Sequence, residues 1–149
     1  MAFGSTLESD VLNLLLAAKA IANIADNAAV APLTVTWIGL HTADPSSGTQ
    51  ATSELAVTGY LRTSVARTTA GWTVSGSGPA SASPVAAINF PLCTSTSTGT
   101  VTNWSIGASS AGAGKLIAQG TLSPSIQISQ NVTPQITTGS SVTDRKSVV

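Results

Sequence analysis

The chain has 149 residues, of which 42% are hydrophobic and only 8% are charged, and its six Lys and Arg residues balance six Asp and Glu residues to a net charge of zero. This length supports one hydrophobic core, and the hydrophobic content is that of a globular protein. The charge balance provides no basic patch to neutralise phosphates, which argues against a nucleic-acid partner.

The charge content is far below the roughly 25% of an ordinary soluble domain. No charged residue occurs between Arg67 and Lys115, where Ser, Thr and Gly are abundant instead. A neutral, hydroxyl-rich surface gives little colloidal repulsion. It therefore suits close packing beside copies of the same chain or beside another protein.

Neither a signal peptide nor a membrane span is expected from the sequence. Glu8 and Asp10 stand where a signal peptide would carry Lys or Arg, and no uncharged run is both long and apolar enough to cross a bilayer. Cys93 is the only cysteine, so no internal disulfide can form, and we expect it to be a small buried hydrophobe.

The N-terminal region carries a helical pattern. Ser5 and Glu8 form a capping box, and apolar residues then recur at helical spacing, which predicts a helix from about Thr6 to about Ile24. This apolar stripe either packs on the rest of the chain or docks on a neighbouring subunit. The candidate partner interface combines stripe residues with one aromatic residue expected to be an exposed anchor: Leu7, Val11, Leu14, Ala18, Ile21 and Trp72.

A strand over residues 33–40 follows, and we expect it to lie in the centre of a sheet. Leu33 and Trp37 fall on one face of it, and Ile38 and Leu40 on the other. A strand that is apolar on both faces belongs where both are covered, so Trp37 is expected in the core.

Short strands and turns fill the remaining sequence. Strands are predicted over 59–67 (Leu61 and Val65 inward), 71–76, 86–92, 100–106, 115–122, 126–128 and 132–138, with 76–84 as an irregular connection. The fold class is all-β: an antiparallel β-sandwich or jelly-roll-like domain of about eight strands with one N-terminal α-helix. We expect one domain over 1–149, made of a helical segment (1–26), a β-sandwich (33–142) and a tail (143–149).

The sequence contains no recognisable catalytic constellation. His41 is the only histidine, no Gly-x-Ser-x-Gly motif occurs, and a structural role for His41 is favoured over catalysis. Asp44 and Glu54 lack the pattern of a calcium loop, and no His, Cys or carboxylate cluster has ligand spacing. We therefore expect no enzyme activity, no catalytic residues, no cofactor and no metal.

Several motifs occur in an order typical of one family. They are LTVTWIGLHTADP (33–45), GYLR (59–62), INFP (88–91), TNWSIG (102–107) and GKL (114–116). Over about residues 7–139 the chain resembles small virion proteins of tailed bacteriophages that are often labelled tail fibre proteins. Leu61 departs from the Ala that the family usually has at that position.

The resemblance implies a structural protein of the virion, made in the host cytoplasm. The first interpretation is a capsid-decorating (cement) protein on the outer capsid surface, which binds between subunits of the major capsid protein and to copies of itself as a dimer or trimer. The alternative is a tail-fibre, collar or baseplate component with a receptor-binding or glycan-binding role. A small hydrolase or lectin is the third hypothesis, and the missing catalytic set argues against it.

Overall fold

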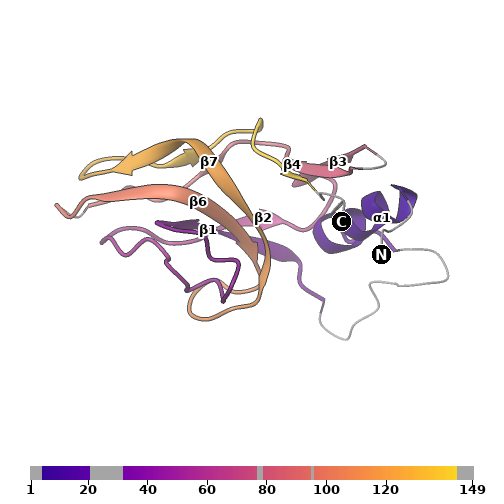
Figure 1. Ribbon diagram of the computed structural model, residues 1–149, viewed down its shortest axis with the longest axis horizontal. Coiled ribbons are helices and arrows are strands. Elements are labelled where there is room, and N and C mark those ends of the chain that lie inside the picture. The colour runs from indigo at the N-terminus through magenta and orange to yellow at the C-terminus, as the bar shows by residue number, and fades with distance from the viewer. Residues whose placement is uncertain (1–4, 21–31, 77–78, 95, 144–149) are drawn as a thin grey trace. The chain divides into compact units, whose positions relative to one another are not determined.

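The computed structural model describes residues 5–20, 32–76, 79–94 and 96–143 (Figure 1). Within them lie one helix and nine strands: α1 (Ser5–Ala17), β1 (Val35–His41), β2 (Thr63–Ala66), β3 (Trp72–Ser75), β4 (Ser81–Pro84), β5 (Ile88–Asn89), β6 (Gly99–Gly107), β7 (Leu116–Ile128), β8 (Gln135–Ile136) and β9 (Val142–Thr143). The paired strands with a defined register are antiparallel. The predicted class, mostly β with one N-terminal helix, is confirmed, whereas jelly-roll connectivity stays a prediction.

The chain forms two compact units, one from parts of 1–34, 66–86 and 137–149 and the other from 35–65 and 87–136. The second unit contains the four-stranded sheet, in the order β2-β1-β6-β7. β1 lies between two partners, as predicted, with Trp37 opposite Gly107 in β6. The predicted division into one domain with helical, sandwich and tail segments stays a prediction.

The two faces of β1 are covered unequally. Ile38 and Leu40 on one face are fully buried, whereas Val35 and Trp37 on the other are half-buried. Leu33, predicted on the same face as Trp37, precedes the strand and is 43% exposed. The expectation that Trp37 belongs to the fully buried core is therefore wrong. The physical reason is local: the loop residue Gln50, rather than a second apolar layer, fills the space beside Gly107, and its side chain donates to the Trp37 carbonyl.

β7 is one long strand where the sequence predicted two. Its pairing with β6 is interrupted: residues 122–125 lie opposite a single residue of β6, Thr102, and the ladder resumes at 126–128. Trp104 of β6 is held over Gly120 of β7, where an added Cβ would lie 2.6 Å from the indole Nε1. Because Gly120 has no side chain, the buried Trp104 ring can pack directly against the backbone of β7.

The segment before β2 is not a strand, and Leu61 does not face inward as predicted. Tyr60 turns inward instead, where its ring stacks on Phe90 at 6.1 Å. Successive side chains of an extended segment alternate, so Leu61 points outward and is 66% exposed. β5, directly before Phe90, pairs with β8 in a two-stranded sheet in which Ile88 and Ile136 are buried.

The other unit contains the sheet β3-β4-β9, against which α1 packs on β3 and β4. β4 forms where an irregular connection was predicted, and Ala80 and Ala82 are fully buried in this unit. Small side chains of this kind give no hydrophobic period in the sequence. They do leave room for a helix to approach the sheet closely.

α1 is shorter than predicted and ends at Ala17 rather than near Ile24. Ala18 adopts a positive φ of 54°, which breaks the helical path. The Arg67 side chain donates to the carbonyls of Leu14 and Leu15, so a cation satisfies exposed acceptors at the negative end of the helix dipole.

Candidate functional site

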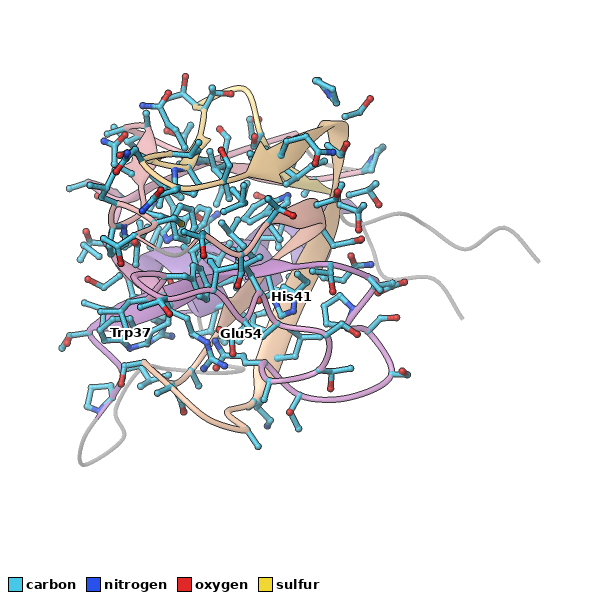
Figure 2. All side chains as sticks on the ribbon, turned by 90° about the vertical axis from the view of Figure 1, so that its left-hand side faces the viewer. Trp37, His41 and Glu54 are labelled. Atoms are coloured by element: carbon cyan, nitrogen blue, oxygen red, sulfur yellow. The ribbon has the colours of Figure 1, made fainter. Side chains whose placement is uncertain are left out.

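A buried polar network lies beside the end of β1 at His41. We call it the loop-anchoring network, because it fastens the 42–62 and 108–115 segments to the sheet. Figure 2 labels two of its members, His41 and Glu54, together with Trp37. His41 and Glu54 also form an isolated β-bridge. Its members are His41, Gln50, Glu54, Tyr60, Arg62 and Ser105.

The strongest contact in the network is the ion pair of Glu54 and Arg62. Nε and Nη2 of Arg62 donate to the two carboxylate oxygens of Glu54, each at 2.7 Å. The same guanidinium donates to the carbonyls of Ser109 (2.9 Å) and Gly112 (2.8 Å). The Arg62 side chain is 1% exposed and that of Glu54 is 20% exposed. A buried, bidentate pair of this kind fixes the position of two loops at once.

Tyr60 connects this ion pair to β1. Its hydroxyl accepts from the Leu40 backbone N–H at 2.9 Å and donates to Glu54 Oε1 at 3.2 Å. Burial raises the pKa of Tyr60 well above its usual value, and the neighbouring Glu54 carboxylate acts in the same direction. The hydroxyl therefore keeps its proton and remains a donor to the carboxylate.

His41 holds the network to β6. Its Nδ1 lies 2.9 Å from the Thr52 carbonyl, which can only accept, so Nδ1 carries the proton. Nε2 lies 2.7 Å from Ser105 Oγ and, in the neutral ring, accepts a hydrogen bond from the Ser105 hydroxyl, which keeps its proton. Burial lowers the pKa of His41 below 6.5, although the Thr52 carbonyl and the Glu54 charge raise it. The neutral imidazole is the favoured state.

Gln50 fastens the 108–115 segment through two hydrogen bonds of its own. Its side-chain oxygen accepts from the Ser109 N–H at 2.9 Å, and its own backbone N–H donates to the Gly114 carbonyl at 3.0 Å. The side chain occupies the space beside Gly107, where a Cβ would lie 1.9 Å from Gln50 Cδ. Gln50 is fully buried, so these groups replace its contacts with water.

The pair of His41 and Ser105 has the spacing of a catalytic dyad, which the sequence did not reveal. A general base and its nucleophile must also reach a substrate. Both residues have no exposed surface, and Gly39 leaves only enough room for their contact. The arrangement is therefore that of a structural hydrogen bond, in agreement with the structural role favoured for His41.

The predicted partner interface is only partly described by the structure. Trp72 is 1% exposed, so the expectation that it is an exposed anchor is wrong: its side chain is buried in the unit that α1 and β4 also form. Leu12, Leu16 and Ala17 are the buried helix residues among those whose side chains are described. Val11, Leu14 and Ala18 are half-buried, the side chain of Leu7 and the whole of Ile21 lie outside the described parts, and their interface role stays a prediction.

The acids do not gather into a metal site in the described parts of the chain. No group of three or more His, Cys, Asp or Glu residues lies together there. Glu54 is engaged by Arg62, and the Asp44 carboxylate accepts from the Ser46 N–H at 2.8 Å. Among the same residues, no helix is long and apolar enough to cross a membrane.

Comparison with known proteins gives one family. No curated protein matches the chain. Residues 6–144 match the protein family described as "Podophage GP4 fiber I protein gp80". The match spans both compact units and includes every member of the loop-anchoring network. This chain therefore belongs to that phage fibre family and is a structural component of the virion.

Proposed function

We propose that the protein is a non-enzymatic component of a phage tail fibre. From the sequence alone, this is the alternative to the capsid cement interpretation. The observation that carries the proposal is the family match over residues 6–144, because the family description names a fibre protein. The cement interpretation rests on a neutral surface and a β-rich fold. A fibre component shares both features, so they do not favour the capsid.

The structure supports a mechanical role over a chemical one. The Glu54–Arg62 pair holds two loops in place, and the His41–Ser105 hydrogen bond joins β1 to β6 where neither side chain has exposed surface. Loops that are fixed at the end of a sheet suit a structural protein that must keep its shape while it is in contact with neighbouring proteins. The proposed partners are therefore copies of this chain and other tail proteins, and the major capsid protein only under the cement interpretation.

Localisation in intact virions tests the proposal. Purified virions would be labelled with a gold-conjugated antibody raised against this chain, and the copy number measured by gel densitometry. We expect label at the tail and a copy number that is a small multiple of the tail symmetry. Label spread over the capsid with hundreds of copies would overturn the fibre proposal and restore the cement interpretation.

A further inference from the structure

The outer edge of β7 is open in the structure. β7 lies at the end of the order β2-β1-β6-β7, next to β6 (Figure 1), and among the described residues β6 is the only strand that pairs with it. In an antiparallel strand every second residue turns its N–H and C=O away from the partner. β7 therefore presents a row of backbone donors and acceptors to the outside.

This edge lacks the usual protection against strand pairing. Natural edges are blunted by shortness, by charged side chains, by proline or by bulges. β7 is the longest strand, and no residue of Leu116–Ile128 is charged. Pro124 and the interruption at 122–125 blunt only its second part. Within the first part, one irregularity at Ile117 separates Leu116 from the regular, uncharged edge of residues 118–121.

We propose that residues 116–121 pair with the same segment of a second copy of this chain, as antiparallel strands around a two-fold axis. An antiparallel edge is complementary to itself under such an axis, because each copy offers the same donors and acceptors in reversed order. Because only every second residue of β7 points outward, residues that face each other across the axis are an even number of positions apart. Gln119 of one copy then lies opposite Gln119 of the other, and Ala118 lies opposite Gly120.

Charge supports a second copy as the occupant. When two copies of one strand pair, each brings the same charged residues to the contact. Residues 116–128 contain no charged residue, so like-charge repulsion does not oppose the pairing. The zero net charge of the chain removes long-range repulsion as well. The opposite edge, β2, is a strand of only four residues. The inference goes beyond the proposed function and holds for either location in the virion.

Sedimentation velocity of the purified full chain over a concentration series tests the proposal. Gln119→Lys places a charge near the two-fold axis, and Gln119→Met is the matched control, since both lose the acceptor that Asn103 Nδ2 uses at 3.2 Å. Ser64→Lys adds the same charge on the exposed β2 edge. We expect a dimer that Gln119→Lys weakens about tenfold relative to Gln119→Met. Ser64→Lys should leave the dimer unchanged.

Hydrogen exchange identifies the surface independently. We expect amides within 116–121 to exchange more slowly as the dimer forms, while those of β2 do not change. A chain that remains monomeric up to millimolar concentration would overturn the proposal. So would a dimer that Gln119→Lys and Gln119→Met affect equally, or one that forms without slower exchange at 116–121.

Discussion

Replacing Arg62 with Met tests how much the loop-anchoring network contributes to stability. Methionine fills a similar space but makes none of the four hydrogen bonds of the guanidinium. The carbonyls of Ser109 and Gly112 then lose the Arg62 donor, and the Glu54 carboxylate keeps only the hydrogen bond from the Tyr60 hydroxyl among those described above. Removing one member of a buried ion pair costs about 3–5 kcal/mol. Because Glu54 is 20% exposed and can regain some water, we expect Arg62→Met to cost about 3 kcal/mol.

Urea unfolding followed by tryptophan fluorescence measures this cost. Lys115→Met is the control, since it removes a cation whose side chain is exposed. The double variant Arg62→Met with Glu54→Gln should be more stable than the Arg62→Met single variant, because it removes the unpaired carboxylate. The loss of an exposed ion pair costs less than about 1 kcal/mol. If Arg62→Met had so small an effect on the free energy of unfolding, the network would not anchor the two loops.

Three further predictions concern single residues. The pKa of His41 is lower in the folded chain than the unfolded value of 6.5, so the unfolded chain binds more protons at acid pH. The free energy of unfolding should therefore fall from pH 8 to pH 5.5 more steeply in the wild type than in His41→Gln. Equal slopes for the two proteins would contradict this. Trp72 Nε1 is buried and has no hydrogen-bond partner among the described residues, so Trp72→Phe should change stability by less than about 1.5 kcal/mol, whereas Trp72→Ala should cost about 3–5 kcal/mol. Equal urea midpoints for these two variants would be inconsistent with a buried ring. Trp37→Ala should cost about 1–2 kcal/mol, since half-burial of the ring removes less surface from water, and a cost above 3 kcal/mol would show that the ring is more deeply buried than the structure has it.

Local patterns in the sequence predicted the strands that carry large apolar side chains. β1 and β6 are rich in Ile, Leu, Val and Trp, and both were located, including the central position of β1. β4 was missed because its small residues show no alternation of apolar and polar positions. The helix end was missed because the apolar spacing continues past Ala17, whereas the backbone turns at Ala18. Composition does not encode such a turn when the residue is not glycine.

The loop-anchoring network could not be predicted in the same way. His41 and Ser105 are 64 positions apart, and Arg62 and Ser109 are 47 apart. Their contacts depend on β6 lying beside β1, which no local pattern specifies. Ser105 is also one of many serines, so its identity carried no information. GYLR, TNWSIG and the LHTADP run contain members of the network, and they pointed to this part of the chain through family resemblance rather than through chemistry.

Outside the helical segment, where Asp10 and Lys19 are exposed, the internal use of charge makes the surface still more neutral than the composition indicates. Within residues 32–76, 79–94 and 96–143 the charged residues are Asp44, Glu54, Arg62, Arg67 and Lys115. Glu54 and Arg62 neutralise each other, and Arg67 is bound to the carbonyls at the end of α1. Asp44 and Lys115 are the two whose side chains are exposed. Neighbouring subunits can therefore approach this surface through hydroxyl, amide and backbone groups without opposing charges to align, which favours strand-to-strand contact as the means of assembly.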